Sequence, residues 1–117
     1  MDSRQRGAWG EDLALGYLKG KKYNIVTRGF RSRFGEIDLI VSNSKYLVFV
    51  EVKLRKNADF AYAREYVGKN KQRKMRLTAE FWLLTHNTRL QPRFDVIEIY
   101  APDEKSVPEI NHIENAF

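Results

Sequence analysis

Hydrophobic positions along the chain follow two different spacings, and each spacing predicts one kind of element. Apolar residues that alternate with polar ones are typical of strands, whereas apolar residues three and four positions apart are typical of helices. The strand-like runs lie at residues 23–30, 37–41, 46–52 and 93–100. The helix-like runs lie at residues 4–19 and 70–85. The tail over residues 110–117 alternates weakly, which predicts an edge strand or a segment packed on the sheet.

The first predicted helix has clear boundaries and one narrow packing face. Asp2 or Ser3 can cap its N-terminus, and Gly20 is the predicted stop. Small and apolar residues share one face with a single acidic residue, in the order Gly7, Gly10, Glu11, Ala14 and Leu18. Small residues allow a helix to lie close to a sheet, and Glu11 would then point inward. A lone helical glutamate is more often solvated, so spacing alone leaves both interpretations open.

The second predicted helix joins an apolar stripe to a basic N-terminal half. Asn70 is its candidate cap, and the buried stripe is Met75, Thr78, Ala79, Trp82 and Leu83. Five basic residues occupy its first two turns: Lys69, Lys71, Arg73, Lys74 and Arg76. Cations near a helix N-terminus oppose the helix dipole. A nucleic-acid backbone would supply the missing anion, although a solvated charged face explains the same pattern.

Residues 37–41 and 46–52 predict two antiparallel strands joined by the polar turn 42–45. A turn centred between residues 44 and 45 places Asp38 opposite Glu51 and Glu36 opposite Lys53, all on one face. Directly opposite residues have Cβ atoms about 5 Å apart, and a slip of one residue would send the charged sets to opposite faces. Strict alternation assigns Ile37 to the other face, with the remaining apolar side chains of that face.

The two carboxylates and the lysine of this hairpin allow two interpretations. Neighbouring carboxylates repel unless a proton or cation lies between them, and Mg²⁺ suits one or two carboxylates with waters and phosphate oxygens. A lysine on the same face could orient a water or neutralise charge on a phosphate, as in metal-assisted phosphodiester hydrolysis. The alternative is a salt-bridge network on a solvated sheet face, which is common in antiparallel sheets. The spacing fits both.

Several short motifs, in this order, resemble those of a known family. Asp38 followed by Glu51-x-Lys53 resembles the PD-(D/E)xK motif of restriction-endonuclease-like nucleases, with Ile37 in the position of the proline. The wider set resembles the YraN-like bacterial proteins over nearly the whole chain. It consists of Gly7-x-x-Gly10-Glu11, Gly35-Glu36-Ile37-Asp38-Leu39-Ile40, Phe49-Val50-Glu51-Val52-Lys53-x-Arg55 and Arg93-Phe94-Asp95-Val96.

The resemblance implies a fold, a reaction and a set of site residues. The fold would be an α/β domain of the restriction-endonuclease-like type, with a mixed β-sheet flanked by helices. The activity would be metal-dependent endonuclease cleavage of DNA in repair or recombination, as in Holliday junction resolvases. Asp38 and Glu51 would bind Mg²⁺ or Mn²⁺, Lys53 would position water or balance charge, and Glu11 would support the metal. Related nucleases also present a Lys or Gln from the later helix, which makes Lys71 and Gln72 candidates.

Basic residues provide candidate contacts to nucleic acid. The net charge of +6 favours a polyanionic partner, here DNA. The candidates precede the hairpin, follow its second strand and begin the second helix: Arg28, Arg31, Arg33, Arg55, Lys69, Lys71, Gln72, Arg73 and Lys74. The first three are predicted to form a loop in which arginine grips phosphate, although a solvated basic turn explains them equally well. A nucleic-acid-binding module without hydrolysis is the alternative function.

Composition and length narrow the remaining possibilities. The 117 residues predict a single domain over 1–117. The chain has no cysteine, which excludes disulfides and thiolate metal sites, and its two histidines argue against a multi-histidine zinc site. The N-terminal residues lead into no long apolar run, so we expect no signal peptide or membrane span and a cytoplasmic protein. A homodimer is expected only by analogy with junction resolvases.

Four further expectations concern individual side chains. Ile25 and Val26 are the core candidates of the first strand. Phe60, Tyr62 and Tyr66 are expected to be core residues, with stacking on bases as the alternative. Asp95 is expected to be structural, bound to Arg93 or a neighbouring strand. His112 is expected to lie outside the catalytic set.

Overall fold

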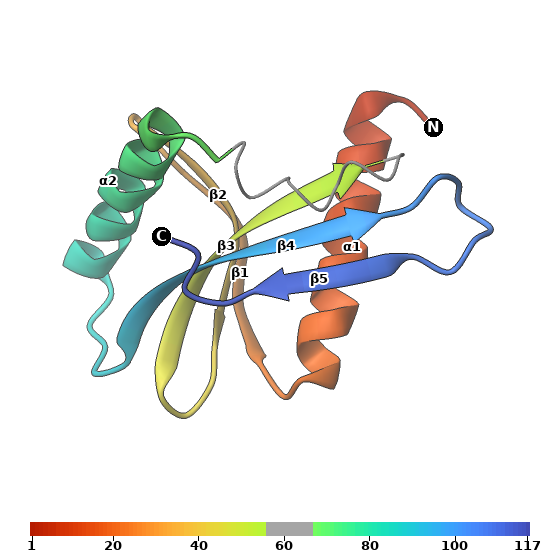
Figure 1. The fold of residues 1–117 in the computed structure, drawn as a ribbon. Coiled ribbons are helices and arrows are strands. Elements are labelled where there is room, and N and C mark those ends of the chain that lie inside the picture. The colour runs from red at the N-terminus through yellow and green to blue at the C-terminus, as the bar shows by residue number, and fades with distance from the viewer. Residues whose placement is uncertain (56–66) are drawn as a thin grey trace.

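A mixed sheet between two helices forms the architecture of the chain (Figure 1). The computed structural model describes residues 1–55 and 67–117. Its elements, in chain order, are α1 Ser3–Gly20, β1 Asn24–Ser32, β2 Gly35–Ser42, β3 Tyr46–Arg55, α2 Lys69–Thr85, β4 Gln91–Tyr100 and β5 Glu109–Ile113. The predicted α/β class and mixed sheet are confirmed. The expectations for Phe60, Tyr62 and Tyr66 lie outside the described residues.

The sheet has the strand order β1-β2-β3-β4-β5, so β3 is central as its apolar sequence predicts. Strands β3 and β4 are parallel, and the other neighbouring pairs are antiparallel. The connection between the two parallel strands contains α2. The C-terminal tail forms the edge strand β5, which confirms that alternative of the prediction.

Alternation along β3 divides the core between the two faces of the sheet. Val48 and Val50 pack toward α1, in a cluster that includes Ala14 and Leu18. Phe49 packs toward α2, in the cluster that includes Trp82. The two helices therefore cover opposite faces (Figure 1). A buried central strand of this kind leaves little room for charged side chains unless they have a specific partner.

Helix α1 begins as the sequence predicts, and it lies close to the sheet. It ends one residue later than predicted: Gly20 is its last helical residue, Lys21 is the C-cap, and Lys22 rather than a glycine has the positive φ of 72° beyond it. Asp2 is the N-cap: its side chain accepts from the Gln5 N–H at 2.8 Å, and the Gln5 side chain accepts from the Asp2 N–H at 2.9 Å. Gly10 faces β3, where an added Cβ would lie 3.3 Å from the Leu54 Cβ. The small residue is what permits this close approach.

Two local predictions are wrong. The N-cap of α2 is Gly68 rather than Asn70, whose side-chain oxygen instead accepts from Arg73 at 3.2 Å. In β1, Ile25 packs on the α1-side core, but Val26 is 41% exposed. An irregularity between Ile25 and Thr27 shifts the register there, and β1 is an edge strand.

No helix within the described ranges is long and apolar enough to cross a membrane.

Candidate active site

The β2–β3 hairpin has the register that brings Asp38 to Glu51. Its ladder pairs Leu39 with Val50 and Ile40 with Phe49, as a turn centred between residues 44 and 45 requires. Asp38 and Glu51 are the next pair along the strands. The β2–β3 ladder ends before this pair. Beyond that point β2 still pairs with β1, and β3 still pairs with β4. The two carboxylates therefore lie where β2 and β3 separate.

The separation of the strands overturns two expectations for β2. Glu36 does not lie opposite Lys53; it lies opposite Arg31 of β1 and forms an ion pair with it at 2.8 Å. Ile37 packs on the α2 side rather than with Leu39 on the α1 side. The neighbouring strand has Gly29 at this level with φ 76°, a left-handed conformation that glycine adopts readily. We attribute the change of face to the local twist at this glycine.

Asp38 has a structural role at the point of separation. Its Oδ2 accepts the backbone N–H of Val52 at 2.8 Å. The carboxylate thus replaces the backbone acceptor that a continued β2 would have offered. This bond fixes the orientation of Asp38 toward β3 and keeps the amide satisfied.

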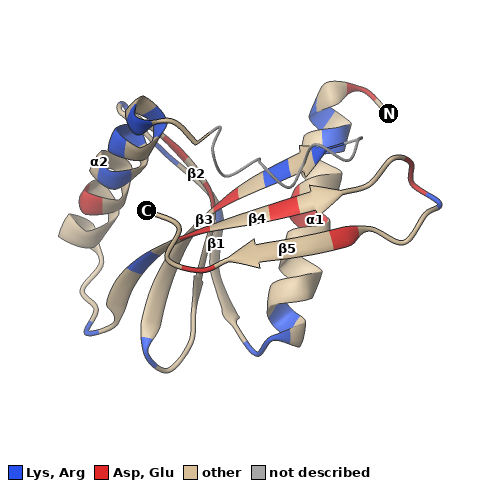
Figure 2. Cartoon of the chain, in the orientation of Figure 1, with Lys and Arg blue, Asp and Glu red and all other residues tan. Residues whose placement is uncertain are grey.

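Glu51 is a buried carboxylate with two lysine partners. The residue is 4% exposed. Its Oε1 lies 3.9 Å from the Lys53 Nζ, and its Oε2 lies 3.3 Å from the Lys71 Nζ. Burial and then the neighbouring Asp38 raise the pKa of Glu51 from 4.5 to about 7, against the opposing effect of Lys71 and Lys53. Figure 2 shows the single acidic position of β3 and the basic first half of α2.

Glu11 borders the carboxylate pair but has its own partner. Arg28 of β1 reaches α1 and binds Glu11 at 3.3 Å, Asp12 at 2.6 Å and the carbonyl oxygen of Ala8 at 2.9 Å. Burial and the charge of Asp38 raise the pKa of Glu11, and the Arg28 hydrogen bond opposes them. Glu11 therefore lies within the electrostatic reach of Asp38, while Arg28 holds its carboxylate.

The basic candidates are distributed around this pair, with different present partners. Arg28 and Arg31 lie within β1 rather than in the predicted loop. Arg33 lies at the β1–β2 turn, over the ring of Phe34 at 4.9 Å. The turn packs on α2, where a Cβ at Gly35 would lie 3.4 Å from the Lys74 Cβ. The turn and the first half of α2 therefore form one basic surface beside Glu51. The Gln72 side chain is directed back toward the start of the helix, where its Nε2 donates to the Val67 carbonyl at 2.9 Å.

Family comparison gives the chain its classification. Residues 10–99 match the Uncharacterised protein family UPF0102. The chain belongs to UPF0102. A UPF0102 protein of Caldicellulosiruptor saccharolyticus is 38% identical over all of both chains. A UPF0102 protein of Caldanaerobacter subterraneus is 41% identical over 100% of this chain and 98% of its own length. A UPF0102 protein of Geotalea daltonii is 44% identical over 99% of this chain and 91% of its own length.

Membership in UPF0102 confirms the YraN-like resemblance that the motifs predicted. The matched region contains α2 and strands β1 to β3, and hence the carboxylate pair and both lysines that contact Glu51. It excludes β5 and the whole of the loop before it. The family match therefore covers the carboxylate pair and both lysines, and the description of the family names no activity.

The oxygen ligands of this UPF0102 chain fit a hard divalent cation with a partly hydrated shell. Asp38 and Glu51 offer carboxylate oxygens, which Mg²⁺ and Mn²⁺ accept, and Mg²⁺ retains several waters in such sites. Burial and then the charge of Asp38 raise the pKa of Glu51, and a bound cation would offset both effects. Across residues 1–55 and 67–117, no group of three or more His, Cys, Asp or Glu side chains is arranged to hold a metal.

Glu98 is a buried carboxylate that sequence reasoning missed. It is 0% exposed, lies beside Lys53 in the parallel β3–β4 register, and accepts from the Asn111 Nδ2 at 3.4 Å. The alternation of Phe94, Val96 and Glu98 was the available signal. It could not be used, because placing Glu98 beside Lys53 requires the register of two strands joined through α2.

The predicted structural role of Asp95 is confirmed on the α1 side of the sheet. Arg93 donates to both of its oxygens at 2.9 and 2.8 Å, His112 contacts it at 2.6 Å, and the Asn115 N–H donates at 3.0 Å. Burial alone would raise the pKa of Asp95, but these hydrogen bonds lower it. The group ties the C-terminal tail to β4.

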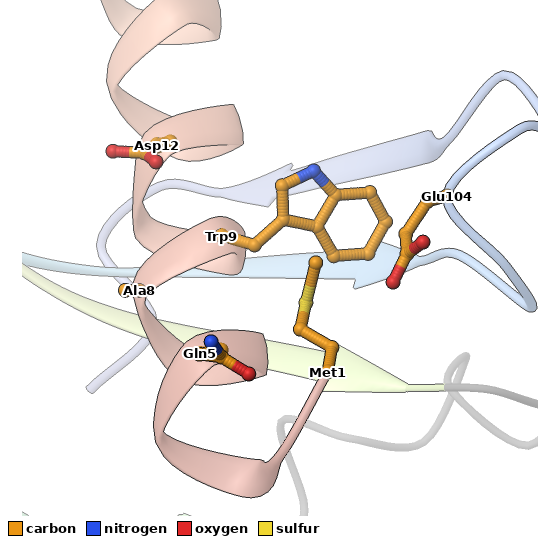
Figure 3. Close-up of a pocket in the computed structure, with 6 residues that line it drawn as sticks. All are labelled: Met1, Gln5, Ala8, Trp9, Asp12 and Glu104. Atoms are coloured by element: carbon orange, nitrogen blue, oxygen red, sulfur yellow. The ribbon is translucent and has the colours of Figure 1, made fainter.

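A surface hollow of about 510 Å³ lies along α1, and neither carboxylate of the pair lines it (Figure 3). Its lining residues are Met1, Gln5, Ala8, Trp9, Asp12 and Glu104. The hollow is wide open, and Asp12 already binds Arg28. It offers no group of catalytic character that compares with buried Glu51.

Proposed function

We propose that this chain is a metal-dependent endonuclease that hydrolyses phosphodiester bonds in DNA. The observation that carries the proposal is the buried Glu51, placed beside Asp38 where β2 and β3 separate and contacted by Lys53 and Lys71. A carboxylate that is both buried and close to another carboxylate opposes folding at neutral pH. Such groups concentrate where a protein needs their chemistry.

The roles of the residues follow from their positions. Asp38 and Glu51 would hold Mg²⁺ or Mn²⁺, which when bound supplies Lewis acidity and an activated water. Lys53, beside Glu51 on the same face, would orient the water or neutralise charge that develops on the phosphate. Glu11 would act through Asp38, whose electrostatic environment it shares.

The basic surface at the β1–β2 turn and the first half of α2 supports a nucleic-acid substrate. Phosphate contacts position a nucleic acid without reading its sequence. The α2 helix packs its apolar stripe on the sheet, and lysine and arginine crowd its first two turns, where they can contact phosphates. We therefore propose that the chain selects its DNA substrate by structure, or has no preference among DNA substrates. By analogy with junction resolvases, we propose a role in repair or recombination.

The test is cleavage by purified protein of labelled single strand, duplex, flap and four-way junction, each with EDTA, Mg²⁺ or Mn²⁺. Asp38→Asn is the first variant, because it preserves an oxygen acceptor for the Val52 N–H while removing the charge. Glu51→Gln is the second. Glu104→Gln is the control, since it removes a carboxylate from an exposed loop.

We expect metal-dependent cleavage that both site variants abolish and the control retains, with DNA binding by Asp38→Asn kept or strengthened. Unchanged cleavage by Asp38→Asn would show that the assignment is wrong. Salt-sensitive DNA binding without cleavage under any metal would favour the alternative, a nucleic-acid-binding module on this fold.

A further inference from the structure

The ion pair between Lys71 and Glu51 joins the basic surface of α2 to the carboxylate site. Lys71 lies in the first turn of α2, and its Nζ is 3.3 Å from the Glu51 Oε2. The Glu51 side chain is 6% exposed, whereas that of Lys71 is 44% exposed. One partner is fixed in the sheet, and the other can move into solvent without leaving its helix.

Lys71 contacts one of the two Glu51 oxygens that a cation at the carboxylate pair could bind. Each oxygen of Glu51 has a lysine neighbour, and Lys71 is the nearer of the two. Lys53 is less exposed and belongs to the same strand as Glu51, so it remains on the sheet face in either case. A divalent cation that binds the Glu51 Oε2 must therefore displace or repel Lys71.

The surroundings of Lys71 offer an alternative partner for its charge. Lys69, Arg73 and Lys74 begin the same helix, and Arg33 lies at the turn that packs against it. This surface attracts phosphate, and an ammonium group released from Glu51 would add one more cation to it. Lys71 thus has an anionic partner in either state, a carboxylate in one and a phosphate in the other.

We propose that Lys71 is an exchangeable counter-ion: it pairs with Glu51 in the cation-free protein and transfers to a DNA phosphate when a divalent cation binds. The inference rests on the proposed function and adds a coupling between cation and DNA. Because coupling between two binding sites is reciprocal, each ligand tightens the other by the same factor.

The experiment measures this coupling by binding alone, without turnover. Ca²⁺, an oxygen-seeking cation, serves as the probe, together with a fluorescently labelled duplex. Calorimetry gives the Kd of Ca²⁺ without DNA, and anisotropy gives the Kd of the duplex in EDTA and in saturating Ca²⁺. Lys71→Gln removes the charge that contacts Glu51. Lys74→Gln is the matched control, because it removes one charge from the same helix at a side chain that packs beside Gly35.

In the wild-type protein we expect Ca²⁺ to tighten duplex binding about fivefold or more, at the low end of typical couplings. Lys71→Gln should bind Ca²⁺ more tightly than wild type without DNA and should show a smaller coupling factor. Lys74→Gln should weaken duplex binding and keep the wild-type coupling factor. Equal effects of the two variants, or undiminished coupling in Lys71→Gln, would overturn the proposal.

These outcomes separate the inference from the proposed function. If wild-type protein cleaves DNA with Mg²⁺ while Lys71→Gln retains full coupling, the counter-ion exchange is wrong and the nuclease assignment stands. If the wild-type protein neither binds Ca²⁺ nor cleaves any substrate with Mg²⁺ or Mn²⁺, both are wrong.

Discussion

Removing the charge of Glu51 should stabilise the metal-free protein. The folded state raises the pKa of this carboxyl from 4.5 to about 7, so between these values the folded protein holds a proton that the unfolded chain has released. Stability therefore falls as pH rises through this window, and the loss is complete above it. The difference corresponds to about 3 kcal/mol, an amount that includes the opposing effect of Lys53 and Lys71.

Urea unfolding in EDTA at about pH 5 and about pH 8 measures the effect. Glu51→Gln should be close to the wild type at the lower pH and more stable by about 3 kcal/mol at the higher pH. Glu104→Gln, at an exposed position, should follow the wild type at both. Adding Mg²⁺ should restore stability to the wild type and leave Glu51→Gln unchanged, because only the wild type retains both carboxylates.

A specific result would refute this reasoning. If Glu51→Gln were less stable than the wild type at about pH 8, Glu51 would contribute net stability through its lysines. The carboxylate would then be a structural ion-pair partner, and the main support for the proposed function would be lost.

Two further predictions concern packing and the opposite face of the sheet. Gly10→Val should destabilise the fold by about 1–3 kcal/mol in thermal melts, because Gly10 lies against Leu54. Gly16→Val is the control: an added Cβ there meets nothing within 4 Å, so it should lack this packing penalty. Asp95→Asn should cost about 3–5 kcal/mol in urea unfolding at neutral pH, because it leaves the charge of Arg93 without its buried anionic partner. The pKa of Asp95 is lowered below 3.8, so its contribution is present above that pH and is lost as pH falls through the lower folded value; the gap between the two proteins should narrow there.

The sequence predicted those parts of the site that depend on local geometry. Asp38 and Glu51 belong to one hairpin, and a short turn fixes both the register and the shared face. The first helix was equally accessible, because its capping box and small residues lie within the helix itself. In each case the residues that decide the structure are close together in the sequence.

The remaining parts depend on how distant elements are placed. Glu98 lies beside Lys53 only through the parallel register of β3 and β4, which no short turn determines. The contact of Lys71 with Glu51 requires the position of α2 over the sheet. Ile37 changes face at the level of Gly29, which has positive φ, and a strictly alternating pattern does not represent such a change.

Because Asp38 accepts the Val52 N–H, selection should act differently on the two carboxylates. Asp38 completes the sheet where β2 leaves β3, so selection for a stable fold would retain it, or an asparagine with the same oxygen acceptor, in a descendant that had lost all catalysis. Glu51 burdens the metal-free fold, and a lineage freed from catalysis would gain stability by replacing it. Among relatives of this protein, the residue at position 51 is therefore the better indicator of retained chemistry, and the aspartate at position 38 by itself is a poor one.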